Sequence, residues 1–140
     1  MREKINVKTG GKLYIAGEYS VLTPGQSAII KNVDIFMNAE ISFLGENEAR
    51  NDEKIEVADK SKEKNDFKKY EIFSDMFDYS VSLEYDKNYS LIQETVVVVN
   101  EYLENKGIDT QPFKLRITGK MEKNGKKYGI GSSGSVTVLV

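Results

Sequence analysis

The sequence contains no histidine and no cysteine. Without histidine, Ser-His-Asp and Cys-His catalysis lack their base, His-ligated metal sites are excluded, and proton transfer is left to Asp, Glu, Lys or Tyr side chains. Without cysteine, neither a disulfide framework nor a thiolate nucleophile is available, which fits a reducing cytoplasm. Any catalysis by this chain must therefore rest on charge, on positioning or on these four side-chain types.

Long apolar runs and a strong excess of one charge are also missing. The longest apolar run is the four valines Val96–Val99, and the N-terminal MREKINVKTGGK has no apolar core, so we expect neither a secretory signal nor a membrane span. The 20 basic and 22 acidic residues leave a net charge of -2, which does not favour nucleic acid or an anionic membrane as a partner. With 39% apolar and 30% charged residues, the sequence predicts one compact domain over residues 1–140, located in the cytoplasm.

Alternating apolar residues predict strands in the first third of the chain. In Lys4–Gly17 they alternate on both sides of Thr9-Gly10-Gly11, which predicts two strands joined at a glycine turn. Thr23-Pro24-Gly25-Gln26 has the residues of a type II turn. The apolar runs Ala28–Val33 and Ile35–Leu44 are the next strand candidates.

Residues 46–69 form a stretch that is dense in charges of both signs. Only Ile55 and Val57 alternate there as a short strand would, so we expect a solvated excursion within the domain rather than a functional segment. Strands are expected again at Tyr70–Phe73 and within Ser74–Asp86, where apolar residues resume their alternation.

A helix is predicted from Leu91 to Lys106. Ser90 and Gln93 have the spacing of a capping box at its start, and Gly107 supplies a left-handed residue at its end. Residues spaced by four, three and four positions form its apolar face: Ile92, Val96, Val99 and Leu103. Beyond it, Pro112–Met121 alternates as a strand, and Asn124-Gly125 is typical of a tight hairpin turn.

A glycine- and serine-rich loop, Gly129–Ser135, follows the hairpin. Three closely spaced glycines, at positions 129, 131 and 134, allow backbone amides to turn inward, and the serines can offer hydroxyls to a phosphate or a magnesium ion. The loop lacks the lysine of a Walker loop and does not match GxGxxG, so a flexible turn is the alternative. Ser135–Val140 is expected to begin a buried helix or strand, and its apolar end suggests the front part of a longer protein.

Two motifs carry a family resemblance. GKLYIAGEYSVL, which is Gly11–Leu22, and GIGSSGSV, which is Gly129–Val136, resemble the two leading motifs of the GHMP kinase family in their order and separation. The chain looks most like the phosphomevalonate kinase branch of the family in four features: Tyr19 and the stretches PGQSAII, YSLIQET and GKKYGIGSSGSV. Mevalonate kinases usually carry histidine at the place of Tyr19. The resemblance covers most of the chain outside the charged stretch. It implies an α+β fold of the type shared with ribosomal protein S5, with a mixed β-sheet and helices packed on one side.

The resemblance also implies an activity, the transfer of the ATP γ-phosphoryl group to 5-phosphomevalonate in the mevalonate pathway of isoprenoid biosynthesis. ATP, Mg²⁺ and the acceptor would then be the small-molecule partners. Lys12 would be the catalytic residue beside the transferred group, and Lys127, Glu18 and Tyr19 would bind the acceptor. The residues implied to bind ATP are Gly129, Gly131, Ser132, Ser133, Gly134 and Ser135, with Ser133 or Ser132 near the metal. Such sites work mainly by positioning and by neutralising negative charge.

The sequence also departs from the family pattern. Gly125 stands where the family commonly has proline, and Gly134 stands where it often has alanine. The family's third glycine-rich motif and the acidic residue usually paired with Lys12 are not found in these 140 residues, so the chain by itself is predicted to be inactive. The alternatives are another GHMP kinase such as mevalonate kinase, a non-catalytic nucleotide-binding module, and structural roles for Lys12, Lys127, Glu18 and Tyr19.

Overall fold

The computed structural model describes residues 4–43 and 69–140. Along the chain the elements are β1 (Lys4–Ala16), the 3-10 turn η1 (Ser20–Leu22), β2 (Ile29–Phe43), β3 (Glu71–Ser74), β4 (Tyr79–Val81), α3 (Ser90–Asn105), β5 (Phe113–Thr118), β6 (Glu122–Lys123), β7 (Lys126–Lys127) and α4 (Ser132–Leu139). The predicted charged excursion at 46–69 lies outside the described residues, apart from Lys69.

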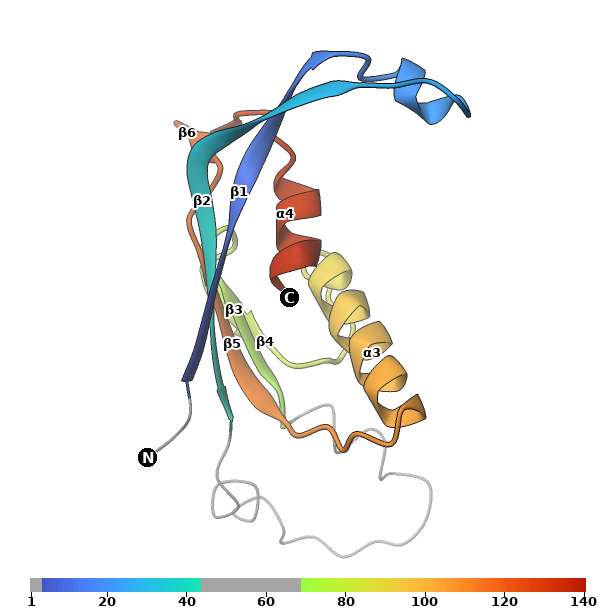
Figure 1. Cartoon of the computed structure of the whole chain (residues 1–140). Helices are drawn as coiled ribbons and strands as arrows, with labels where there is room; N and C mark the ends of the chain where they lie inside the picture. Colours follow the sequence, from blue (N-terminus) through green and yellow to red (C-terminus); the bar gives the residue numbers. More distant parts are fainter. Residues whose placement is uncertain (1–3, 44–68) are drawn as a thin grey trace, which may run out of the picture.

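Five of the strands form one mixed sheet in the order β1-β2-β5-β3-β4. β3 and β5 run parallel, and the other neighbours are antiparallel. Both helices lie on the same face of this sheet (Figure 1), and β6 and β7 form a separate hairpin. The expected α+β fold, with a mixed sheet and helices on one side, is therefore confirmed.

The period of two along the central strands decides which face of the sheet is buried. One set of side chains packs under the helices, and the other set, which includes Asn38, Glu40 and Arg116, points away from them. The buried core gathers residues from the strands and both helices: Met37, Ala39, Ile72, Leu115, Ile117, Ile92, Val96, Val136 and Leu139. The sheet thus has one apolar face covered by helices and one polar face.

The predicted turn at Thr9-Gly10-Gly11 is wrong. β1 is a single strand of 13 residues. It pairs with the 15-residue β2, which joins the two strands predicted at Ala28–Val33 and Ile35–Leu44. Gly10 pairs with Phe36 and Gly11 with Val33, so two extra residues of β2 bulge out at this point. The glycines therefore allow an irregular ladder and a close tertiary contact instead of reversing the chain.

The helix is confirmed as α3, but the capping box at its start is wrong. Its N-cap residue is Tyr89, which makes no side-chain cap. The Gln93 amide instead donates to the carbonyls of Ser82 (2.8 Å) and Glu84 (2.6 Å) and accepts from the Asp86 amide (2.9 Å). The strand predicted within Ser74–Asp86 is short and ends at Val81, and the Gln93 side chain satisfies backbone groups of the residues that follow it.

The remaining local predictions are confirmed. Gly107 ends α3 with φ 74°, and Asn124 and Gly125 both have positive φ in the β6–β7 turn. Gln26 N donates to Thr23 O at 3.1 Å across the predicted Pro-Gly turn, where Gly25 has φ 84°. Strands occur at β3 and β5 as expected. In the described part of the chain, no helix has the length and apolar content needed to cross a membrane.

Candidate active site

The glycine- and serine-rich loop leads directly into α4. Gly129 and Gly131 both have positive φ, at 69° and 82°, and Gly131 is the N-cap residue of the helix. Of the two structures expected after the loop, the chain forms the helix, which begins at Ser132 and has no side-chain cap. Its first amides therefore point from the positive end of the helix dipole toward any anion bound there.

The loop is fixed on β1 at the point where the ladder is irregular. Lys12 N donates to Ile130 O at 2.8 Å, and Ser135 Oγ donates to Gly10 O at 3.1 Å. The buried Ile130 side chain occupies the space next to Gly11, where an added Cβ would lie 2.6 Å from Cδ1 of Ile130. Glycine is thus required at position 11 for the loop to approach the strand this closely.

Lys12 lies beside the helix start. A Cβ added to Gly131 would come within 3.2 Å of Lys12 Cγ and 3.3 Å of Lys12 Cε, so the lysine side chain runs along this glycine. Lys12 Nζ lies 5.0 Å from the centroid of the Tyr14 ring. The structure therefore brings together the predicted catalytic lysine and the predicted phosphate loop, which are far apart in the sequence.

A pocket of about 140 Å³ opens next to the loop, between the starts of α3 and α4. It contains three of the predicted site residues, Lys127, Ser132 and Ser133. The β3–β4 turn contributes Met76 and Phe77 to the rest of the lining, and the start of α3 contributes Leu91 and Ile92. Asn88, just before α3, and Val136, in α4, complete it. Sequence reasoning missed Asn88 and Phe77 as site residues, because only the packing of the two helices brings them to the loop.

Hydrogen bonds hold Asn88 in place at the rim of this pocket. The Asp86 carboxylate accepts from the amide of Asn88 (2.8 Å) and the amide of Tyr89 (3.3 Å). It also accepts from the Tyr79 hydroxyl, at 3.0 and 3.2 Å. Asn88 Nδ2 in turn donates to the oxygen of the same Tyr79 hydroxyl at 3.0 Å.

Tyr89 packs against Phe77, which forms part of the pocket wall. Its fully buried ring lies 4.9 Å from the ring of Phe77, and its hydroxyl accepts from Ser74 N at 3.0 Å and donates to Tyr79 O. Burial raises the pKa of the Tyr89 phenol above its ordinary value, and the hydrogen bond from Ser74 opposes this only in part. The phenol is therefore neutral near pH 7 and keeps both hydrogen bonds.

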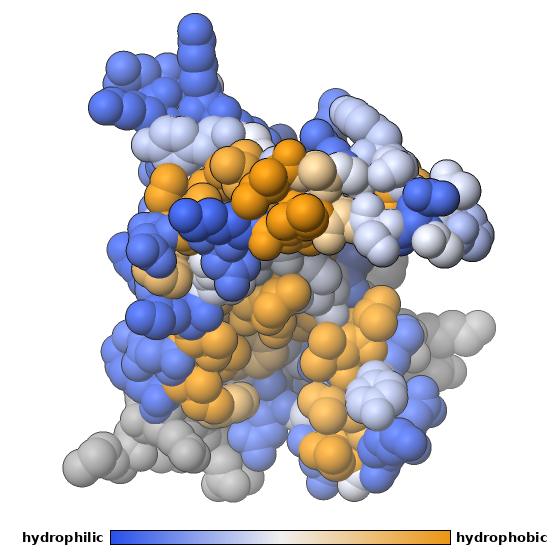
Figure 2. All heavy atoms as spheres, turned by 45° about the horizontal axis from the view of Figure 1, so that its top comes forward, coloured by the Kyte–Doolittle hydropathy of each residue, from blue (hydrophilic) through white to orange (hydrophobic). Residues whose placement is uncertain are grey.

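Glu18 and Tyr19 lie elsewhere, on the arm, the name used here for residues 13–32, which comprise the end of β1, η1 and the start of β2. The arm extends beyond α4 in Figure 1, and the Tyr19 side chain is 80% exposed. Figure 2 shows hydrophobic residues gathered over this side of the molecule. The exposed apolar residues of the arm include Leu22 and Ile29. Neither Glu18 nor Tyr19 lines the pocket at the loop, and their role in acceptor binding stays a prediction.

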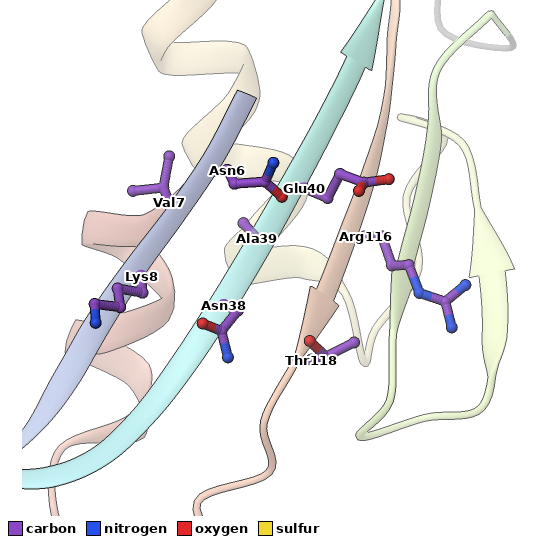
Figure 3. Close-up of a pocket in the computed structure, with 8 residues that line it drawn as sticks. All are labelled: Asn6, Val7, Lys8, Asn38, Ala39, Glu40, Arg116 and Thr118. Carbon is purple, nitrogen blue, oxygen red and sulfur yellow. The ribbon is translucent and has the colours of Figure 1, made fainter. Parts of the chain in front are cut away.

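A larger pocket, of about 480 Å³, lies on the polar face of the sheet (Figure 3). Its charged groups are engaged by neighbours on the sheet instead of converging. Lys8 Nζ lies 4.8 Å from the Phe36 ring centroid, and the Arg116 guanidinium is equally close to the Phe73 ring. Glu40 accepts from Lys4 Nζ at 2.8 Å. We therefore place the candidate site at the loop, on the helical side of the sheet.

Comparison with known proteins shows what the chain is similar to. No protein-family model matches it. It aligns with phosphomevalonate kinase of Streptococcus pneumoniae, solved in complex with phosphomevalonate and AMPPNP, with a TM-score of 0.77 and 47% identity over 96% of this chain and 34% of that one. The Lin0012 protein of Listeria innocua aligns with a TM-score of 0.74 and 27% identity over 99% of this chain and 35% of that one.

A curated relative agrees with these structures. Phosphomevalonate kinase of Streptomyces sp. (strain CL190) is 26% identical over 128 residues, which are 91% of this chain and 34% of the relative. The chain is thus homologous to phosphomevalonate kinases, and it spans about a third of the length of the relatives it matches.

Proposed function

We propose, on the basis of this homology, that the chain forms the ATP-binding part of a kinase that phosphorylates 5-phosphomevalonate to 5-diphosphomevalonate. The observation that carries the proposal is the loop Gly129–Gly131, which caps α4 and is fixed on β1 beside Lys12. Phosphoryl transfer needs donors and cations held around the phosphate oxygens, and this arrangement supplies backbone amides, a helix dipole and a lysine.

We assign the ATP phosphates to the start of α4. The positive φ of Gly129 and Gly131 turns the backbone toward the anion, and the amides of Ser132, Ser133 and Gly134 follow in the first helical turn. Ser133 is exposed and lines the pocket, so its hydroxyl is our candidate Mg²⁺ ligand. Ser135 contributes indirectly, because its buried hydroxyl is used to hold the loop on Gly10.

The two lysines have different roles in this proposal. Lys12, beside Gly131, neutralises charge on the transferred group. Lys127 lines the same pocket as Ser132 and Ser133, so we assign its charge to the ATP phosphates as well as to the approaching acceptor phosphate. Glu18 and Tyr19 are kept as acceptor contacts that the arm supplies.

The chain covers about a third of its relatives, so complete turnover is assigned to a larger assembly. We infer that the chain binds MgATP and that transfer requires polypeptide corresponding to the remaining two thirds of the relatives. The reaction is placed in the cytoplasm as part of the proposal, consistent with a sequence that has no cysteine.

Calorimetric titration of the chain with MgATP tests the nucleotide half of the proposal. Ser133→Ala should weaken binding by about tenfold or more, because a hydroxyl that contacts a charged ligand is lost. Ser20→Ala, on the arm, is the matched control and should bind as the unaltered chain does. A folded chain that shows no MgATP binding would contradict the proposal.

The acceptor is tested in a chimera that joins this chain to the remaining two thirds of the S. pneumoniae enzyme, to which it is 47% identical. Release of ADP from MgATP should depend on 5-phosphomevalonate and should fall by about 100-fold in Lys12→Ala, because the lysine neutralises charge in the transition state. Release that depends on mevalonate instead would favour a different GHMP kinase.

A further inference from the structure

The hydrogen bonds around Asn88 determine which way its side-chain amide faces. The oxygen and nitrogen of an asparagine amide are assigned from their partners, and here the partner is the hydroxyl of Tyr79, 3.0 Å from Nδ2. A tyrosine hydroxyl has one proton to donate, and an ionised carboxylate can only accept. The Tyr79 proton is therefore used on Asp86, 3.0 Å away, and the Tyr79 oxygen is left as an acceptor.

The carboxylate that starts this chain of bonds is itself fixed. Asp86 accepts from the backbone amides of Asn88 and Tyr89, just before α3 begins, so it cannot turn away from Tyr79 without losing both. Asp86 thus fixes the direction of the Tyr79 hydroxyl proton, and the Tyr79 hydroxyl in turn fixes the orientation of the Asn88 side-chain amide. Asn88 must present its NH₂ group to Tyr79. Its Oδ1 has no hydrogen-bond partner among the described residues, and because Asn88 is exposed and lines the pocket, this oxygen is available to a ligand there.

The pocket is suited to a nucleoside next to the phosphate loop. Ser132, Ser133 and Lys127 lie at its phosphate end, and the side chains of Phe77, Leu91 and Ile92 supply apolar walls for a planar base. An acceptor fixed at the rim favours a ligand group that donates a hydrogen bond and disfavours one that only accepts. Adenine carries an amino group at C6, whereas hypoxanthine carries a carbonyl oxygen there.

We propose that Tyr79 is a positioning residue that holds Asn88 with its oxygen toward the pocket and so makes the site select ATP over ITP. The inference rests on the proposed function, since it requires a nucleotide in this pocket. Tyr79→Phe tests it cleanly. The variant keeps the ring that contacts Phe77 and Tyr89 and the backbone carbonyl that accepts from Tyr89, and it removes only the hydroxyl. Asn88 is then able to turn over and offer NH₂ instead.

The experiment is an NMR titration of the ¹⁵N-labelled chain with MgATP, MgITP and Mg-2′-deoxyATP, which yields affinities and follows the Asn88 side-chain amide signals together. The unaltered chain should bind ATP about tenfold more tightly than ITP, because a base bound in the pocket would cover the exposed Asn88 side chain and one mismatched hydrogen bond there costs this order of affinity. It should bind 2′-deoxyATP within about threefold of ATP. In Tyr79→Phe the ratio of ATP to ITP affinity should fall below about threefold. Tyr85→Phe, whose ring is 78% exposed, is the control and should keep the original ratio.

Each outcome separates the two proposals. An unchanged ratio in Tyr79→Phe, or equal affinity of the unaltered chain for ATP and ITP, would overturn the role of Tyr79 while leaving nucleotide binding intact. Dependence on the ribose 2′-hydroxyl in place of the base would also overturn it. A folded chain that binds none of the three nucleotides would contradict the proposed function itself, and this inference with it.

Discussion

The middle of the β1–β2 ladder and its end on the arm differ in how well they are supported. Near Gly11, β1 is covered by the loop, and Ile130 is only 7% exposed against it. Beyond Lys12 the same strand continues into the arm, where Leu22 is 79% exposed. The predicted residues for ATP lie beside the supported middle part, and two of those for the acceptor, Glu18 and Tyr19, lie on the arm. The proposed nucleotide half of the site is therefore formed by contacts within this chain, and the proposed acceptor contacts on the arm are not.

The largest expected difference is between Ile130→Ala and Leu22→Ala. Ile130→Ala should lower the free energy of unfolding by about 3 kcal/mol, because it leaves a cavity between the loop and β1. Leu22→Ala should change it by less than about 0.5 kcal/mol, because the side chain is already exposed. Urea denaturation measures both values, and similar losses for the two variants would show that the arm is packed in solution.

Two glycines provide the next comparison. Gly11→Ala should cost about 2 kcal/mol, since the new methyl group would meet Ile130 and Val33 within 3.0 Å. Gly25→Ala, in the arm, has open space around it and a positive φ, so it should cost only about 1 kcal/mol of backbone strain. Equal costs, again by urea denaturation, would mean that Ile130 moves aside easily and that the loop is not held as described.

Two serines differ in the same way by a smaller amount. Ser135→Ala removes the buried hydrogen bond to Gly10 and should cost about 1 kcal/mol. Ser20 donates to Gly17 O at 3.3 Å on the exposed arm, and its loss should not be measurable. Thermal unfolding of both variants, at one protein concentration, distinguishes them. A destabilised Ser20→Ala with an unaffected Ser135→Ala would reverse the assignment of the two regions.

The smallest effect is the pH dependence that Tyr89 introduces beneath the pocket. Its pKa is raised in the folded chain, so the unfolded chain loses this proton first as the pH rises above about 10. The contribution of Tyr89 to the free energy of unfolding is therefore complete below that pH and declines above it. The decline is smaller than about 1.4 kcal/mol per pH unit, which is the largest slope that one proton can give. Unfolding midpoints between pH 8 and 11 should fall more steeply for the unaltered chain than for Tyr89→Phe, and parallel curves would exclude this contribution.

Local sequence signals predicted most elements but not what the glycines at 10 and 11 do. A glycine pair suits both a turn and a bulge, and the choice is made by β2 and by Ile130, which is distant in sequence. Gln93 shows the same limit. Its spacing from Ser90 suits a capping box, but its side-chain amide instead donates to carbonyls of the preceding loop.

Only the part of the candidate site that belongs to sequence motifs could be predicted. The loop and Lys12 belong to motifs with recognisable sequences, and the structure places them side by side. Asn88 and Phe77 have no such signal, because their contribution depends on how α3 packs against α4 and the β3–β4 turn. Residues that form a pocket wall through tertiary packing become visible only in the folded chain.

The central claim, that the nucleotide half of the site is already formed in this chain, is tested most directly by mapping amide chemical shifts on addition of MgAMPPNP. The account predicts that the shifts cluster at Lys127–Val136 and at Asn88, with no change on the arm at Glu18–Leu22 or on the polar sheet face at Asn38 and Arg116. Shifts centred on the arm or on the polar face, with none at the loop, would contradict it.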